Sequence, residues 1–215
     1  MEVAAEKFKQ NKNAAEFIGA LENEIQSMKR SGRADNILTV IKTAAKTAKE
    51  LNQTQTAADM LACALTLYEQ GKNHAKEKVK LRVEMNSLYS EALGSGQNGA
   101  GKELVEKIEK NGTMLGAEYT ELVNSLAKIK NIEERIRKMY EAAELIEKYN
   151  SDWAYRTLES ARGQLMYSKV PASEGNIKQI RNYWYPRLNN KVQEIKERNF
   201  WNERKEIRLE TAGIN

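Results

Sequence analysis

Apolar residues recur along this chain every three or four positions, the spacing that places them on one face of an α-helix. The longest such stripe covers residues 113–150, where five apolar residues follow one another at intervals of seven: Leu115, Leu122, Ile129, Ile136 and Ala143. No proline interrupts this stretch. We therefore predict one long central helix here, with a break near Asn131, where the stripe changes phase.

Four shorter amphipathic patterns precede this stripe. They cover about 13–30, 35–51, 57–70 and 73–93, and short polar or glycine-containing turns separate them. We predict an N-terminal four-helix unit at 1–93. The stretch 94–101 has four glycines among eight residues, which leaves the backbone free and gives few side chains to bury. We interpret it as a linker to a C-terminal helical unit at 102–215.

Within the C-terminal unit, a short pattern at 102–110 is expected to end at Asn111-Gly112, before the long stripe. Ser151-Asp152 can cap a further helix, and a loop with Pro171 follows it. The last apolar pattern starts at Ile177 and contains Pro186. Because proline lacks the N–H group and clashes with the preceding turn, we expect a kink or a restart there.

These elements predict an all-α fold of seven to nine helices. No segment alternates as a half-buried strand does. The turns at Gly32 and Gly71 are 39 residues apart, as are Gly112 and Ser151. Such a period fits stacked helical hairpins of the tetratricopeptide or HEAT kind, and a helical bundle fits equally well.

Composition narrows the class of protein further. Charged residues make up 30% of the chain and hydrophobic ones 40%, and only two prolines occur, which suits a soluble helical protein. A single cysteine, Cys63, excludes an internal disulfide, so we expect a reducing, cytoplasmic compartment. The chain has no apolar run of about 18 residues, so no membrane span or membrane partner is expected.

The net charge of +5 is concentrated near the C-terminus. Between residues 178 and 208 nine basic residues stand against four acidic ones, which equals the excess of the whole chain. Any electrostatic partner is therefore expected at the basic C-terminal end.

Two features look like chemistry. Residues 96–102 match the glycine and lysine spacing of a phosphate-binding loop, but Glu103 stands where a hydroxyl should hold magnesium, and no strand precedes it. His74 is the only histidine and Cys63 lies eleven residues away, which gives no metal-ligand set and favours a buried, inert thiol. We predict no cofactor, no metal and no enzymatic activity.

The most informative segment interleaves aromatic and basic residues at 181–201. We predict that a surface formed by it binds another protein or a second copy of this chain, as Trp, Tyr and Arg favour. Its candidate residues are Arg181, Trp184, Tyr185, Arg187, Lys191 and Trp201. Nucleic acid is an alternative partner, because aromatic rings stack on bases. A further alternative is that Trp184 packs in the core.

Residues 132–190 also show a family resemblance. A helix opening Ser151-Asp152-Trp153-Ala154 is followed by a short loop, Ile177 and an aromatic–proline stop at 184–186. This stretch resembles the all-helical C-terminal extensions of divergent bacterial Hsp70-family chaperones. The chain lacks the nucleotide domain and the β-rich domain of that family. The resemblance therefore implies a non-enzymatic interaction or scaffold module, such as an accessory tail of a chaperone.

Overall fold

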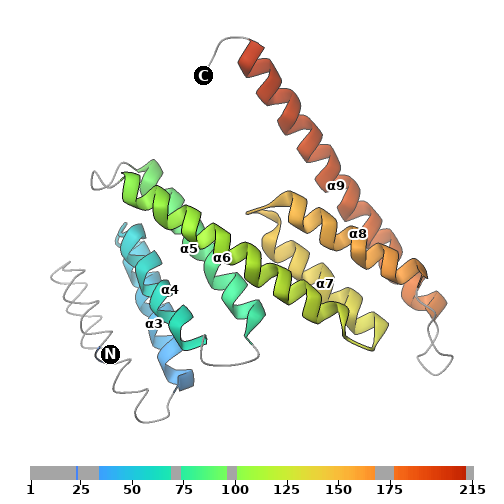
Figure 1. Ribbon diagram of the computed structural model, residues 1–215, viewed down its shortest axis with the longest axis horizontal. Helices are drawn as coiled ribbons and strands as arrows, with labels where there is room; N and C mark the ends of the chain where they lie inside the picture. The colour runs from blue at the N-terminus through green and yellow to red at the C-terminus, as the bar shows by residue number, and fades with distance from the viewer. Residues whose placement is uncertain (1–22, 24–33, 69–73, 96–100, 168–176, 212–215) are drawn as a thin grey trace. The chain divides into compact units, whose positions relative to one another are not determined.

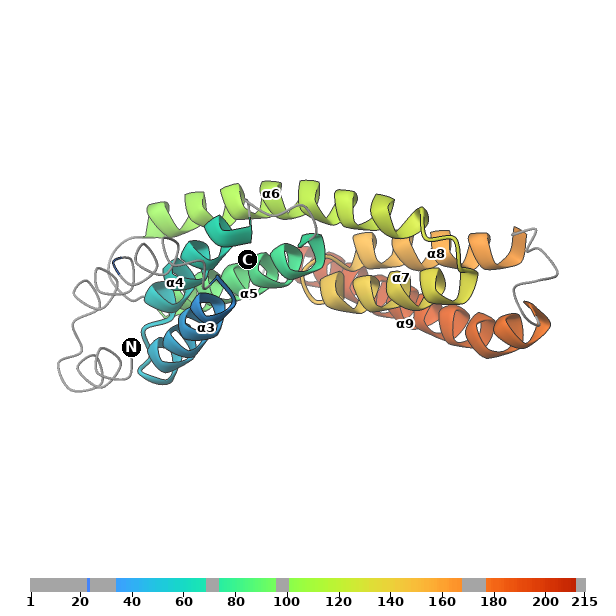
Figure 2. The same cartoon turned by 90° about the horizontal axis from the view of Figure 1, so that it is seen from below.

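The computed structural model describes residues 34–68, 74–95, 101–167 and 177–211, together with Asn23. These residues contain seven helices and no strand (Figures 1 and 2), which confirms the predicted all-α class. Four pairs of consecutive helices, α3 with α4, α4 with α5, α7 with α8 and α8 with α9, pack against each other, as in helical hairpins or a bundle. The helix predicted at 13–30 and the glycine-rich residues 96–100 lie outside the described residues.

The chain divides into two compact units, 1–119 and 120–215. The first unit contains α3 (Ala34–Glu50), α4 (Thr54–Tyr68), α5 (Ala75–Gly94) and the first part of α6 (Gly101–Ala127). Helix α4 packs against both α3 and α5. Alanines occupy much of this interface, which lets the helix backbones approach closely. The buried alanines are Ala44, Ala45, Ala48, Ala57, Ala58, Ala64 and Ala92.

The turn between α3 and α4 depends on Asn52. Its φ is +59°, in the left-handed region that Asn adopts more readily than most residues. The N–H group of Gln53 then donates to the carbonyl of Ala48 at 2.9 Å. This turn satisfies the end of α3 and reverses the chain, so that α4 can pack back against α3.

Helix α6 runs through Asn111 and Gly112, so the predicted end of a short helix at this pair is wrong. The reason is that the buried Asn111 side chain forms its hydrogen bonds with residues of α5 and therefore does not cap the end of a helix. Its Nδ2 donates to the carbonyl of Arg82 at 2.9 Å and to Asn86 Oδ1 at 2.7 Å, and its Oδ1 accepts from Arg82 Nη1 at 2.9 Å. Asn111 thus connects α6 to α5.

The boundary between the units also differs from the predicted linker at 94–101, because it lies inside α6, between Tyr119 and Thr120. Leu104 on α6 belongs to the same hydrophobic cluster as α3, α4 and α5. Lys107 and Glu118, also on α6, form ion pairs with residues of α4 and α5. The first half of α6 therefore packs with the N-terminal helices and not with the rest of the predicted C-terminal unit.

The second unit contains the end of α6, α7 (Ile132–Glu147), α8 (Ser151–Tyr167) and α9 (Ile177–Thr211). Helices α7, α8 and α9 lie side by side (Figure 2). The long helix predicted at 113–150 is divided between α6 and α7, and the predicted break near Asn131 is confirmed. Asn131 is the N-cap of α7, where its side chain accepts from the N–H group of Glu134 at 2.9 Å.

Two smaller expectations in this unit also need correction. Asn150, and not the predicted Ser151-Asp152 pair, caps α8, since its Oδ1 accepts from the N–H group of Trp153 at 2.9 Å. Helix α9 continues through Pro186, which excludes the predicted restart, and the alternative of a kink stays a prediction. Because Pro186 and Asn182 are exposed, water can satisfy the Asn182 carbonyl that lacks its usual donor.

Candidate interaction surfaces

Trp184, at the centre of the predicted binding surface, lies in the core of the second unit. Its side chain is only 8% exposed. The Trp184 ring lies 5.8 Å from that of Tyr140 on α7 and 5.3 Å from that of Tyr183. These distances are typical of aromatic pairs in cores. The alternative of core packing is therefore the one that the structure shows for Trp184.

Arg181 and Lys191 make structural contacts. Arg181 donates from Nε to the carbonyl of Leu165 and from Nη2 to that of Met166, both at 3.0 Å, and so satisfies carbonyls at the end of α8. Lys191 Nζ lies 3.0 Å from a carboxylate oxygen of Glu147 on α7. These two cations hold α9 against α8 and α7.

The remaining predicted residues are Tyr185, Arg187 and Trp201. Arg187 is exposed, with its guanidinium stacked 3.5 Å from the ring centre of Tyr183. Tyr185 is 38% exposed. Trp201 belongs to α9, but its side chain lies outside the described residues. The partner-binding role of this segment remains a prediction, and three of its six residues are accounted for by contacts within the unit.

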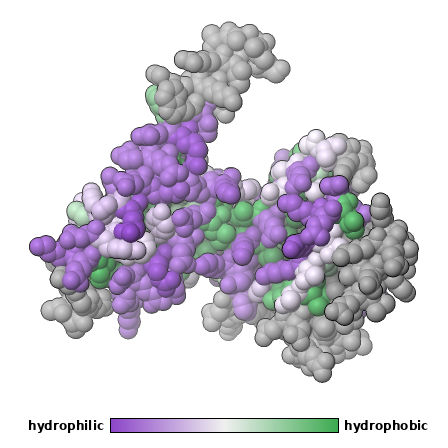
Figure 3. Space-filling view, turned by 180° about the vertical axis from the view of Figure 1, so that it is seen from behind, coloured by the Kyte–Doolittle hydropathy of each residue, from purple (hydrophilic) through white to green (hydrophobic). Residues whose placement is uncertain are grey.

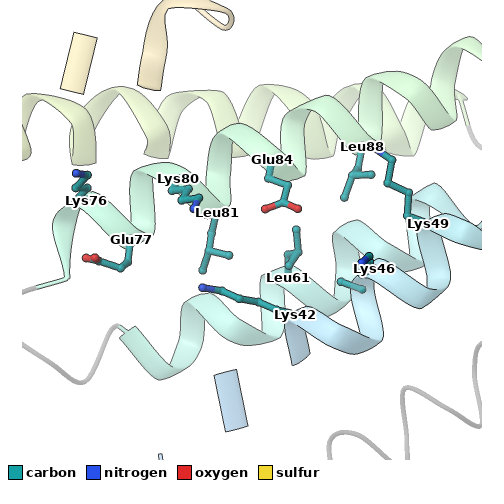
Figure 4. Close-up of a pocket in the computed structure, with 11 residues that line it drawn as sticks. Lys42, Lys46, Lys49, Leu61, Lys76, Glu77, Lys80, Leu81, Glu84 and Leu88 are labelled. Atoms are coloured by element: carbon teal, nitrogen blue, oxygen red, sulfur yellow. The ribbon is translucent and has the colours of Figure 1, made fainter. Parts of the chain in front are cut away.

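The first unit contains a groove that is a second candidate binding site (Figure 4). Its cavity volume is about 480 Å³, and it lies between α3 and α5 with Leu61 of α4 at its base. The lining residues are Lys42, Ala45, Lys46, Lys49, Leu61, Lys76, Glu77, Lys80, Leu81, Glu84 and Leu88.

Helical periodicity explains why lysines line both walls of the groove. On α3 the lining positions 42, 45, 46 and 49 follow the spacing of a single helix face. On α5 positions 76, 80, 84 and 88 do the same. The apolar members of these faces pack toward α4, and long lysine stems cover apolar surface while their ammonium groups reach water. The result is an apolar base between two basic rims.

The groove has an excess of positive charge. Five lysines line it against two glutamates, Glu77 and Glu84. Lys46 pairs with Glu50 at 3.9 Å and Lys49 with Glu91 at 3.6 Å, both in exposed positions where ion pairs contribute little. Lys42 and Lys80 form no salt bridge with another described residue. An anionic partner would therefore gain new ion pairs here.

A second cavity in the same unit has a volume of about 260 Å³. Its lining includes Tyr89 and Lys107, which form a polar cluster with Asp59. The Tyr89 hydroxyl donates to Asp59 Oδ1 at 2.8 Å, and Lys107 Nζ lies 3.2 Å from the same oxygen. Burial, and then the Asp59 carboxylate, raises the pKa of Tyr89 far above its usual range. Burial lowers the pKa of Lys107, but contacts with Glu103 and Asp59 outweigh it and raise the pKa overall. Both groups keep their protons, which suits a structural link between helices.

Arg82 and Glu118 form a second polar link in this unit. Arg82 Nε donates to Glu118 Oε2 at 2.7 Å, and both side chains are largely buried. Arg82 also reaches Asn111 and lines the second cavity. Two of the three cations at this cavity, Arg82 and Lys107, are therefore paired within the protein.

Cys63 and His74 both lie in the first unit. Cys63 is half-buried on α4, and the His74 ring lies 4.9 Å from that of Tyr68. Within the described part of the chain, no group of three or more His, Cys, Asp or Glu could hold a metal ion. Phosphate-loop residues 96–100 lie outside that part, and Gly101 and Lys102 begin α6.

The sequence pattern predicts a binding surface at the aromatic C-terminal segment and not at this groove. The sequence does contain a signal for one basic wall of the groove, because Lys42, Lys46 and Lys49 border the alanine face of α3 at helical spacing. The sequence did not show that α3 and α5 both pack on α4 and so form the two walls of the groove.

No described helix is long and apolar enough to cross a membrane. No protein-family model, curated protein sequence or solved structure matches this chain.

Proposed function

We propose that this protein is a non-enzymatic interaction module that uses the groove between α3 and α5 to bind another protein. The observation that carries the proposal is the open groove itself, with apolar side chains at its base and Lys42 and Lys80 without described salt-bridge partners. The apolar residues at the base are at most 4% exposed, so a partner would gain contact mainly with the apolar stems of the lysines and ion pairs with their ammonium groups. An accessory role beside a chaperone, implied by the resemblance of 132–190, is one form of this proposal.

Protein is favoured over nucleic acid by the chemistry of the lining. Sites for single-stranded nucleic acid combine positive charge with aromatic rings on which bases stack. The lining has neither an aromatic residue nor an arginine, and Glu77 and Glu84 would repel a phosphate backbone. Most of the visible surface in Figure 3 is hydrophilic, with hydrophobic residues confined to patches.

A charge-reversal variant tests this function. Lys42→Glu with Lys80→Glu changes the groove, and Lys130→Glu with Lys178→Glu is a matched control at exposed positions of the second unit. The wild-type chain, the groove variant and the control variant each serve as bait in a pull-down under identical conditions. Each protein that is recovered is then purified, and its affinity for the three baits is measured by titration. We expect at least one protein to bind the wild type and the control with equal affinity.

The groove variant should bind that protein about tenfold or more weakly, since two attractive charges become repulsive. Circular dichroism establishes that both variants retain their helical content. If every protein that binds the wild type also binds the groove variant with unchanged affinity, the groove is not the binding site and the proposed function is wrong.

A further inference from the structure

We propose that the occupant of the groove is an amphipathic α-helix of the partner protein, with an apolar face flanked by carboxylates. This inference rests on the proposed function and specifies the partner. It follows from three properties of the groove, namely its length, its position over α4 and the arrangement of its charges.

The length of the groove suits a short helix. Its lining on α5 extends from Lys76 to Leu88, which at 1.5 Å per residue is about 18 Å, or roughly three helical turns. On α3 it extends from Lys42 to Lys49, about two turns. A partner segment of about 12 to 14 residues would span the groove.

The position of the groove suits a helix rather than an extended strand. Helices α3 and α5 both pack on α4, and the groove lies between them with Leu61 at its base (Figure 4). A helix laid over α4 would lie between α3 and α5, with its side-chain ridges packed into the grooves between neighbouring helices. An extended peptide would need a sheet edge for its backbone hydrogen bonds, and the described residues include no strand.

The charges predict acidic residues on both flanks of the partner helix. Lys42, Lys46 and Lys49 lie on the α3 wall, and Lys76 and Lys80 on the α5 wall (Figure 4). Glu77 and Glu84 lie on the α5 wall alone, so a single basic residue is tolerated on that side of the partner. Apolar residues at positions i, i+3, i+4 and i+7 would face the base.

Synthetic helices test this inference on the intact chain. The probe is a fluorescent peptide of about 14 residues, with Leu at one helix face and Glu beside it. One control peptide has the same composition but a scrambled order that removes the apolar face. A second control has every Glu replaced by Lys. Binding is followed by fluorescence anisotropy at about 50 mM and about 300 mM salt, since screening weakens ion pairs.

We expect the acidic amphipathic peptide to bind the wild type and the Lys130→Glu, Lys178→Glu control equally. Its affinity should fall several-fold at the higher salt concentration and about tenfold in the Lys42→Glu, Lys80→Glu variant. The scrambled peptide should bind at least about tenfold more weakly, because it cannot present apolar residues and carboxylates together. The lysine peptide should bind the charge-reversed variant better than the wild type.

Two results would overturn the inference. One is equal binding, or no binding, of the ordered and scrambled peptides. The other is a single-stranded oligonucleotide that binds the groove more tightly than the acidic peptide does. In either case the proposed function still stands if natural partners are lost from the groove variant, so the two failures can be distinguished.

Discussion

Glu147 on α7 is the acceptor that holds Lys191 of α9 in place. Lys191 Nζ lies 3.0 Å from Glu147 Oε2, and the Glu147 side chain is only 9% exposed. Arg198, about two turns further along α9, donates to the other oxygen of the same carboxylate. Two cations of the basic C-terminal end therefore converge on one acid, and part of the positive charge there stabilises the helix packing.

Glu147→Gln is expected to lower the free energy of unfolding by about 1–2 kcal/mol at neutral pH, because two charge-assisted contacts are lost. Burial raises the pKa of Glu147, but hydrogen bonds from Arg198 and Lys191 outweigh it and hold the pKa below its ordinary value. A carboxyl with a lowered folded-state pKa stabilises the protein above its unfolded pKa, and this stabilisation is lost as the pH falls through the folded pKa.

The difference between wild type and Glu147→Gln should therefore be largest near neutral pH and shrink below about pH 4.5. Urea titrations at several pH values measure it. Glu144→Gln, at an exposed position of the same helix, is the control and should change stability little. A difference that stays constant from pH 7 to about pH 3 would contradict the assigned ion pairs.

Trp184→Ala is expected to destabilise the protein by about 3–5 kcal/mol, since it removes a buried ring that packs against Tyr140. Tyr185→Ala, at the exposed neighbouring position, should cost less than about 1 kcal/mol. Thermal and chemical unfolding of the two variants measure this contrast. Equal effects would mean that the Trp184 ring is not part of the core.

Asn111→Ala is expected to cost about 2–4 kcal/mol, because it leaves polar groups of Arg82 and Asn86 buried without partners. Thr113→Ala is the control, since its side chain is exposed and bonds only to the carbonyl of Glu109 within the same helix. Chemical denaturation compares the two. A loss below about 0.5 kcal/mol for Asn111→Ala would fit the helix end predicted from sequence and contradict the continuous α6.

Gly163→Ala is expected to raise stability by about 0.5–1 kcal/mol, because glycine inside a helix has a high entropic cost. Gly163 lies within α8, and a Cβ atom added there meets nothing within 4 Å. An increase in the melting temperature would confirm that this part of α8 is a regular helix with open space beside it. A decrease would show that the position needs glycine.

The sequence by itself determined the fold class and most helix positions. The spacing of apolar residues depends on the geometry of a single helix, so it needs no knowledge of neighbouring elements. The stripe over 113–150 predicts a long helix with a break near Asn131, and the structure confirms the break, since α7 begins directly after Asn131. The same local reasoning failed at Asn111-Gly112, because a polar residue beside glycine usually ends a helix. Here Asn111 is instead buried between Arg82 and Asn86 of α5.

Tertiary structure decided which charged and aromatic residues are available to a partner. From sequence, Arg181, Trp184 and Lys191 had the composition of a binding surface. Their partners, Leu165, Tyr140 and Glu147, lie 16 to 44 positions away in the chain and come near only when α7, α8 and α9 pack together. The lysine groove likewise exists only because α3 and α5 both pack on α4. Helix periodicity is local, whereas burial and charge pairing depend on contacts between segments distant in sequence.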